Sequence, residues 1–185
     1  MIDTTYELVS EAKNGNKKAL ETLLKQQEKN IKATLFYLKK DDLDLADLTQ
    51  EVLFKINNKI TQLKNPKHFK TWLNQVILNS YYDYLRKNKK FKNDTQIDKI
   101  DVPDFNSNPQ DRILNNELDF IIKTSISTLP IHYKIPITLR EIQGLSYDEI
   151  SSITNTTIGT VKSRIARARA MIKNDISKYS RGEVE

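Results

Sequence analysis

The chain has 185 residues, carries a formal net charge of +6 at pH 7 and is 38% hydrophobic, so it is long enough for one domain or two small ones. Its excess of Lys and Arg favours a polyanionic partner. It contains no cysteine, which excludes disulfides and thiolate metal sites, and it has neither a signal peptide nor an apolar run of membrane-spanning length. We therefore expect a soluble cytoplasmic protein that inserts no segment into a membrane.

Amphipathic periodicity predicts helices along the first half of the chain. A short first helix opens near Thr4 and ends at residues 14–16. The apolar residues of the second helix recur at steps of three, four and seven: Leu20, Leu24, Ile31, Leu35 and Leu38. The third helix starts near Asp44, and its predicted inner side carries Leu45, Leu48, Val52, Ile56 and Leu63. The fourth spans residues 69–88 and is predicted to bury Leu73, Val76, Ile77, Tyr84 and Leu85.

The periodicity fails between residues 88 and 109, where charges and asparagines mix with Pro103 and Pro109. We interpret residues 91–110 as a flexible linker. Beyond it, apolar spacing predicts a helix over 113–129 that Pro130 closes, and a short helix over 135–142 with Pro136 in its first turn. No strand pattern occurs. The sequence therefore predicts an all-α fold of two small helical domains, residues 1–90 and 111–180.

Residues 146–173 predict a helix, a tight turn and a second, strongly basic helix. Ser146 and Glu149 have the spacing of a capping box, which starts the first of these helices. Asn155 tolerates the left-handed conformation that a tight turn needs, and Thr157 is placed to cap the second helix. This order of elements is the helix-turn-helix arrangement of many DNA-binding proteins.

The second helix of this pair has two different faces. Its apolar side is formed by Val161, Ile165, Ala168 and Ile172. Its opposite side has a centre of small residues around Arg167, flanked by cations at Lys162, Arg164, Arg169 and Lys173. Small side chains let a helix enter a major groove about 12 Å wide while the flanking cations reach phosphates. A solvated basic helix at the end of a bundle is the alternative interpretation.

Three motifs occur in order along the chain. They are DLTQEVLFK at residues 47–55, FKTWL at 69–73 with Asn79 and the DYLR of 83–86, and GTVKSR at 159–164 with the RAR of 167–169. Together they resemble the extracytoplasmic-function (ECF) group of bacterial RNA polymerase sigma factors. The resemblance implies a sigma region 2-like helical bundle, which binds core RNA polymerase and opens the promoter, and a region 4-like helix-turn-helix domain, which reads the upstream promoter element.

Acidic residues gather at the start of the third helix, although the protein is basic overall. The resemblance implies that this surface docks on the coiled coil of the largest polymerase subunit, through Asp44, Asp47, Leu48, Gln50 and Glu51. The alternative is that the acids only complement the dipole of their own helix.

The fourth helix carries the residues that the resemblance assigns to the melted strand of the minus-ten promoter element: Trp72, Asn79, Asp83, Arg86 and Lys87. Unpaired bases stack on aromatic rings and form hydrogen bonds along their edges, which suits Trp72 and Asn79. Arg86 and Lys87 suit phosphates. As the only tryptophan, Trp72 could instead be a core anchor.

For the second domain, the resemblance places the basic helix in the major groove of the minus-thirty-five element. The residues implied are Thr160, Lys162, Ser163, Arg164, Arg167 and Arg169. Ser163 and Arg167 are expected nearest to base edges, with Lys162, Arg164 and Arg169 mainly on phosphates. The family is usually held inactive by an anti-sigma protein, which implies such a partner here.

The chain departs from the family pattern in the turn before the basic helix. Thr154, Asn155 and Thr156 stand where an apolar residue, a glycine and another apolar residue are usual, and Ser151 replaces an expected alanine. The two threonines predict a thinner core between the helices, and the preferred promoter sequence cannot be copied from relatives.

Two other classes of function compete with this interpretation. An enzyme is disfavoured because there is no glycine-rich phosphate loop, the two histidines lie in different predicted domains, and no cofactor is expected. Asp44, Asp47 and Glu51 share a face that could bind a divalent cation, but they lack ligands from other elements. The second rival is a stand-alone helix-turn-helix regulator that binds duplex DNA without polymerase.

Overall fold

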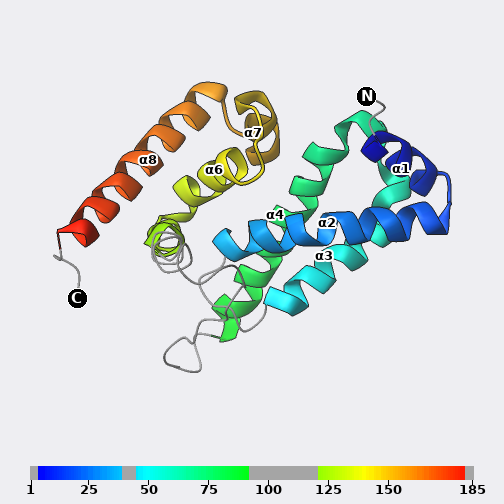
Figure 1. Ribbon diagram of the computed structural model, residues 1–185, viewed down its shortest axis with the longest axis horizontal. Coiled ribbons are helices and arrows are strands. Elements are labelled where there is room, and N and C mark those ends of the chain that lie inside the picture. The colour runs from blue at the N-terminus through cyan, green and yellow to red at the C-terminus, as the bar shows by residue number, and fades with distance from the viewer. Residues whose placement is uncertain (1–3, 39–44, 92–120, 182–185) are drawn as a thin grey trace, which may run out of the picture. The chain divides into compact units, whose positions relative to one another are not determined.

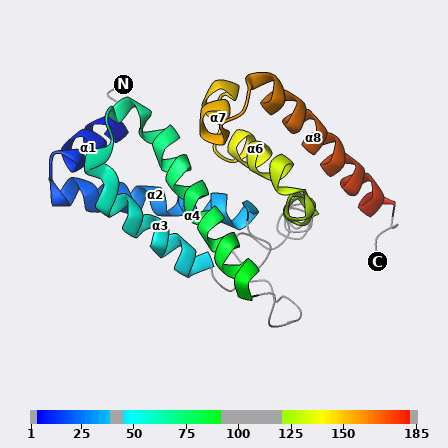
Figure 2. The same ribbon diagram turned by 180° about the vertical axis from the view of Figure 1, so that it is seen from behind.

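The computed structural model describes residues 4–38, 45–91 and 121–181, and within these ranges every regular element is helical (Figures 1 and 2). Contacts divide the chain into two compact units, the first built mainly from the helices before residue 92 and the second from those after residue 120. The predicted all-α fold of two small helical domains is confirmed. The predicted linker, residues 91–110, lies outside the described residues except for Phe91.

The described helices of the first unit are α1 (Thr4–Lys13), α2 (Lys17–Leu38), α3 (Leu45–Lys59) and α4 (Phe69–Phe91), with two short 3-10 turns, η1 (Ile60–Gln62) and η2 (Pro66–His68), between α3 and α4. Gly15 has a φ of +92° in the turn between α1 and α2, which an L side chain would not adopt without strain. α3 packs against α4, so the helices with the predicted polymerase-binding and melted-strand residues are neighbours (Figure 1).

The core of the first unit is aliphatic. The side chains with no exposed surface include Val9, Leu23, Ile31, Leu35, Val52, Ile56 and Ile77. Burying each such side chain contributes about 1.5–3 kcal/mol, which offsets the entropy cost of ordering the helices. The predicted inner side of α3 is confirmed at Leu48, Val52 and Ile56, and Leu63 is buried just beyond η1, where the α-helix has already ended.

The apolar residues whose spacing predicted α2 are not all buried in its first half. Ala19 and Leu23 are buried, whereas Leu20 and Leu24 are only half-buried. Successive residues of a helix point about 100° apart, so this stretch has two overlapping apolar faces. Tertiary packing selects one of them, and the sequence spacing alone cannot.

The last turns of α4 also differ from the prediction. Tyr84 and Leu85 are half-buried, and Tyr81 is the aromatic residue that enters the core. Burial, together with neighbouring Tyr82, raises the pKa of Tyr81 to about 12, so its phenol stays neutral. Asn74 is also buried, and its amide donates to the carbonyl oxygen of Lys70 at 2.9 Å.

The described part of the second unit starts with a helical segment at residues 121–128, followed by α6 (Ile131–Glu141), α7 (Tyr147–Thr154) and α8 (Ile158–Ser180). α6 packs against both α7 and α8. The core of the second unit includes Leu139, Leu145, Ile150 and Val161, each of which has no exposed surface. These contacts fix α8 along its apolar side.

The predicted start of α6 was wrong by four residues. The helix begins at Ile131 rather than at residue 135, and Pro136 lies inside it. The carbonyl oxygen of Pro130 accepts from the amides of Tyr133 at 2.9 Å and Lys134 at 3.0 Å, so Pro130 opens this helix as well as ending the previous one. Pro136 lacks one amide donor, and its ring is buried in the core with its neighbours.

Candidate nucleic-acid interface

The predicted helix-turn-helix is present and is held by three local caps. In the capping box, the Ser146 hydroxyl accepts from the Glu149 amide at 3.2 Å, and the Glu149 carboxylate accepts from the Ser146 amide at 2.8 Å. α7 then ends at Asn155, whose φ of 52° is left-handed. The Thr157 hydroxyl accepts from the Thr160 amide at 3.2 Å and so caps α8. Each of these features was predicted from the sequence.

Hydroxyl side chains form hydrogen bonds in the turn at positions where relatives are expected to have apolar residues. Ser151 donates to the carbonyl oxygen of Thr156 at 2.5 Å, and Thr154 donates to the carbonyl oxygen of Ile150 at 2.7 Å. The hydroxyls of Thr154 and Thr156 also lie 2.9 Å apart. The departures at these three positions therefore act together, because hydrogen bonds hold the turn in place of apolar contacts.

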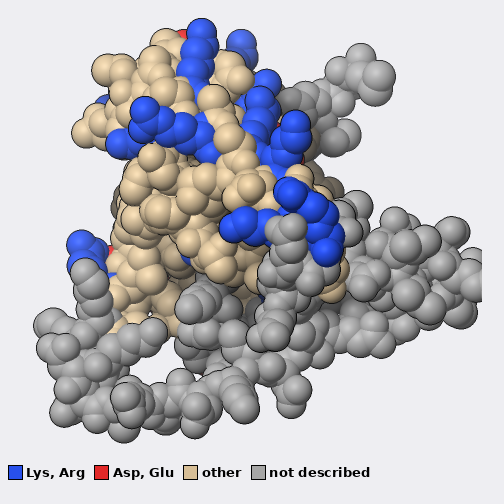
Figure 3. Space-filling model, turned by 90° about the vertical axis from the view of Figure 1, so that its left-hand side faces the viewer, with Lys and Arg blue, Asp and Glu red and all other residues tan. Residues whose placement is uncertain are grey.

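α8 turns its apolar side inward and leaves its basic side open. Val161, Ile165 and Ala168 are at most 1% exposed. The residues exposed on the other sides of the helix include Lys162, Ser163, Ala166, Arg167, Arg169 and Ala170, while Thr160 and Arg164 are half-buried. Figure 3 looks onto the α8 side of the second unit and shows Lys and Arg side chains spread over this face with little Asp or Glu between them. All six predicted duplex-contact residues thus lie on one helix, and none is buried.

One of those six residues, Arg169, is already ion-paired with a carboxylate of another helix. The Arg169 guanidinium donates to a carboxylate oxygen of Glu141 on α6, at 2.6 Å from Nη2 and 3.2 Å from Nε. These hydrogen bonds raise the pKa of Arg169 above its ordinary value. Contact with a phosphate would compete with Glu141 for the same guanidinium.

A second arginine beside this pair was not predicted from the sequence. The Arg140 guanidinium lies 4.8 Å from the centre of the Tyr147 ring, and the Lys162 ammonium lies 5.7 Å from it. Arg140 also donates to the carbonyl oxygen of Leu145 at 2.7 Å. The ring and this carbonyl hold Arg140 beside the basic face of α8. The signal in the sequence that could have indicated Arg140 is its position as a basic residue in the last turn of α6, the helix before the helix-turn-helix.

The acidic surface predicted on α3 is only partly described. Asp44 lies outside the described residues, Asp47 and Gln50 are exposed, and Glu51 is half-buried. Leu48 is 3% exposed, so it belongs to the core and offers no surface to a partner.

The largest exposed apolar side chain of α3 is Phe54, with 66% of its surface exposed. It lies four residues after Gln50 and three after Glu51, on the same side of the helix. No role for this phenylalanine was predicted from the sequence, although it lies within the first of the three motifs.

One lysine connects α3 with α4. The Lys55 ammonium lies 2.7 Å from the Glu51 carboxylate on its own helix, and 3.1 Å from both the Asp83 carboxylate and the Ser80 hydroxyl on α4. Burial lowers the pKa of Lys55, but the hydrogen bonds and charges of Glu51 and Asp83 outweigh it, so the pKa is raised. Hydrogen bonds from Lys55 and Arg86 lower the pKa of Asp83.

This network joins residues that were predicted to bind different partners. Glu51 was assigned to polymerase, yet it pairs with Lys55 and lies 4.0 Å from the Lys87 ammonium. Asp83 was assigned to the melted strand, yet it pairs with Lys55 and with Arg86. A carboxylate that pairs with two cations holds those cations in position. The carboxylate itself would repel a phosphate, because both are negatively charged.

The other residues predicted for the melted strand line one side of α4. Asn79, Arg86 and Lys87 are exposed. Trp72 is half-buried, and its ring centre lies 6.0 Å from that of buried Phe69. The Trp72 side chain is therefore anchored against the core and still partly accessible, so the two interpretations of this residue do not exclude each other.

Among the described residues, no helix is long and apolar enough to cross a membrane. Nor does this part of the chain bring together three or more His, Asp or Glu side chains in an arrangement that could hold a metal ion.

A helix-turn-helix with an open basic helix, preceded by a separate helical bundle, defines a helical nucleic-acid-binding protein. Two family models match the chain: Sigma-70 region 2 over residues 23–91 and Sigma-70, region 4 over residues 119–172. The ECF RNA polymerase sigma-E factor of Haemophilus influenzae is 32% identical over 182 residues, which cover 94% of this chain and 95% of the relative. The factor of the same name from Escherichia coli K12 is 32% identical over 181 residues, with 94% of both chains covered.

Two solved structures have the same fold. "Structure of CnrH in complex with the cytosolic domain of CnrY" matches with a TM-score of 0.67 and 21% identity over 95% of this chain and 98% of that one. The sigma factor RpoE, in complex with the anti-sigma factor NepR from Bartonella quintana, matches with a TM-score of 0.73 and 22% identity over 86% of this chain and 98% of that one.

The chain belongs to the ECF family of RNA polymerase sigma factors. The members of this family are transcription initiation factors, and their two sigma domains bind RNA polymerase and promoter DNA.

Proposed function

We propose that the two units divide the work of promoter recognition. Residues 1–90 bind core polymerase and hold the melted minus-ten element, residues 91–110 link the domains, and residues 111–180 read the minus-thirty-five element as duplex. The observation that carries this proposal is α8, which has a buried apolar side and an exposed side of small residues and cations.

In the duplex complex, α8 enters the major groove. Ala166 and Ala170 on the exposed side are small enough for close approach to base edges, and Arg167 is exposed beside them. An arginine that forms two parallel hydrogen bonds with guanine contributes about 1–3 kcal/mol of base discrimination. Ser163 also meets base edges, whereas Thr160, Lys162, Arg164 and Arg169 contact the backbone. Arg140 joins them on the phosphates.

On the first unit, α4 holds the melted strand. Trp72 offers the accessible part of its ring for base stacking, and Asn79 offers an exposed amide that both donates and accepts. Arg86 and Lys87 follow the phosphates, which adds affinity without sequence content. Asp83 acts indirectly, because it holds Lys55 and Arg86 in place.

The acidic edge of α3 docks on the coiled coil of the largest polymerase subunit. Asp47, Gln50 and Glu51 supply the polar contacts, with Asp44 before them in the sequence, while Leu48 supports the helix from inside. Phe54 supplies an exposed aromatic side chain of the kind that often dominates the energy of a protein interface.

The protein works in the cytoplasm, where core polymerase and promoter DNA are found, and an anti-sigma protein restrains it. The two solved sigma factors with this fold are each described in complex with a second protein, one of them an anti-sigma factor by name. This supports a restraining partner for the present chain as well.

The proposal is tested with two variants in two assays. Arg167→Ala should lower promoter-specific transcription by about tenfold or more and leave core-polymerase binding nearly unchanged, because the arginine reads bases. Asp47→Ala should weaken core binding directly. Matched controls are Lys178→Ala, an exposed cation near the end of α8, and Glu21→Ala, an exposed carboxylate on α2. Equal losses in both assays for both variants would contradict the division of labour, and absence of core binding by the parent chain would favour a stand-alone regulator.

A further inference from the structure

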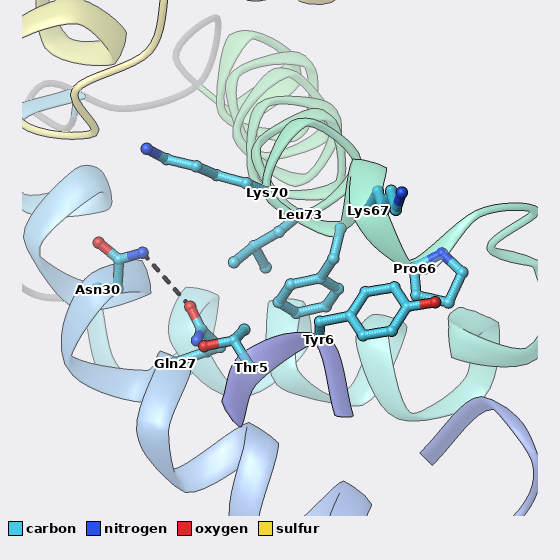
Figure 4. A pocket seen from close by; sticks show the side chains of 9 residues that line it. Thr5, Tyr6, Gln27, Asn30, Pro66, Lys67, Lys70 and Leu73 are labelled. Atoms are coloured by element: carbon cyan, nitrogen blue, oxygen red, sulfur yellow. Dashed lines mark hydrogen bonds between the residues drawn. The ribbon is translucent and has the colours of Figure 1, made fainter. Parts of the chain in front are cut away.

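A cavity of about 580 Å³ opens in the first unit, on a side that the proposed function does not use. It lies between the first turn of α1, the middle of α2 and the start of α4 (Figure 4). Its lining residues are Thr5, Tyr6, Gln27, Asn30, Pro66, Lys67, Phe69, Lys70 and Leu73. Pockets that bind small ligands have volumes of about 300–1,000 Å³. The cavity is therefore large enough for a molecule of mononucleotide size.

The cavity is separate from the stripe of α4 proposed for the melted strand. Lys70 precedes Trp72 by two residues, so its side chain leaves the helix about 200° further round, on the opposite side. Leu73 also faces the cavity and is 1% exposed, whereas Asn79 is exposed on the other side. A strand bound along Trp72 and Asn79 would not enter the cavity.

The floor and walls of the cavity suit a flat ring. Phe69 and Leu73 form an apolar floor and are 4% and 1% exposed. Tyr6 is 40% exposed, so its aromatic side chain is accessible for stacking. In Figure 4, Leu73 points from α4 toward the amides of Gln27 and Asn30 on α2, where the Asn30 nitrogen donates weakly to the Gln27 oxygen at 3.4 Å. The nitrogen of the Gln27 amide is left to donate to a ring edge.

The charged groups around the cavity favour an anion. Lys67 and Lys70 are its only charged lining residues, both are exposed, and neither ammonium has an ion-pair or hydrogen-bond partner in the described part of the chain. Among the described residues no carboxylate lines the cavity, so a cationic ligand would meet the positive charge of the two lysines. Lysine ammonium groups are common phosphate binders.

We propose that this cavity is a binding site for a free nucleoside phosphate, with the base between Tyr6 and the apolar floor and the phosphate near Lys70 or Lys67, whose side chains extend to opposite sides of the cavity (Figure 4). A nucleotide within a single strand of DNA carries the same base and phosphate groups and is the alternative ligand. The position of the cavity behind the melted-strand stripe favours the free ligand. The bound nucleotide would tie α1 and α2 to the start of α4.

The test is calorimetric titration of the full chain with AMP, adenosine, inorganic phosphate and a short single-stranded oligodeoxynucleotide. We expect AMP to saturate one site and to bind about tenfold or more tightly than either adenosine or phosphate, because only AMP engages both halves of the cavity. Absence of saturable AMP binding would overturn the proposal. So would binding of the oligonucleotide without binding of AMP, because the strand would then be the source of the nucleotide.

Variants of the full chain locate the site. The pair Lys67→Gln and Lys70→Gln should weaken AMP binding by about tenfold or more, and Tyr6→Leu should weaken both AMP and adenosine. Lys25→Gln is the matched control, because Lys25 is exposed on α2 and leaves that helix about 200° from Gln27. An unchanged affinity in the paired variant, or an equal loss in Lys25→Gln, would overturn the assignment. Circular dichroism confirms that each variant is folded.

Discussion

Replacing Lys55 by methionine should loosen the contact between α3 and α4 and lower the free energy of unfolding of the first unit. Lys55 lies 2.7 Å from Glu51 and 3.1 Å from Asp83, and its side chain is 24% exposed, so the charges are partly screened by water. Exposed ion pairs contribute about 0.2–1 kcal/mol each. We expect Lys55→Met to cost about 1–1.5 kcal/mol in total, and a double-mutant cycle with Asp83→Asn to give a coupling energy of about 0.5–1 kcal/mol.

The cycle is measured by urea unfolding, with the Lys32–Glu28 pair as the control. That pair spans 2.6 Å within α2, and 48% of the lysine side chain is exposed, so its coupling should be smaller. The pKa of Asp83 is lowered from 3.8, so its stabilising effect is present above that pH and is lost as the pH falls through the folded value. A coupling energy of zero at neutral pH, or one that persists after Asp83 is protonated, would refute this explanation.

Two further variants test single contacts of the second unit. Thr138 has no exposed surface, and its hydroxyl has no hydrogen-bond partner among the described residues. Thr138→Val should therefore raise the free energy of unfolding by about 1 kcal/mol in urea unfolding, and a loss of stability would show that the hydroxyl is satisfied in solution. Glu141→Gln should weaken the hold on Arg169 and raise affinity for any DNA duplex severalfold at low salt, with the gain shrinking as salt rises. Fluorescence anisotropy measures this, and an affinity that does not change at any salt concentration would contradict it.

The helix-turn-helix was predictable in detail because its determinants are local. Ser146 and Glu149 are three residues apart, and Thr157 caps the helix that follows it directly. Asn155 adopts the left-handed conformation that its side chain tolerates best after glycine. Such features depend on nearest neighbours along the chain, so no knowledge of tertiary packing was needed.

The inner face of α2 and the start of α6 could not be predicted because tertiary contacts decide them. Leu20 and Leu23 are equally apolar, and only the packing of the rest of the unit buries one and leaves the other half-exposed. Pro136 normally disfavours a helix interior, yet the apolar environment of α6 compensates for one missing hydrogen bond.

Candidate site residues could be named from the sequence, but the interactions among those residues could not. Glu51 and Asp83 are far apart in sequence, and nothing in their motifs shows that Lys55 pairs with both. In the proposed function this pairing has a consequence. A polymerase group that binds Glu51 would compete with Lys55 and with nearby Lys87, and would release positive charge beside the melted-strand residues of α4. Binding of polymerase and binding of the melted strand would then be favourably coupled. Polymerase would bind the Glu51 carboxylate, which otherwise neutralises the lysines beside the strand, and the strand would bind those lysines, which otherwise neutralise Glu51.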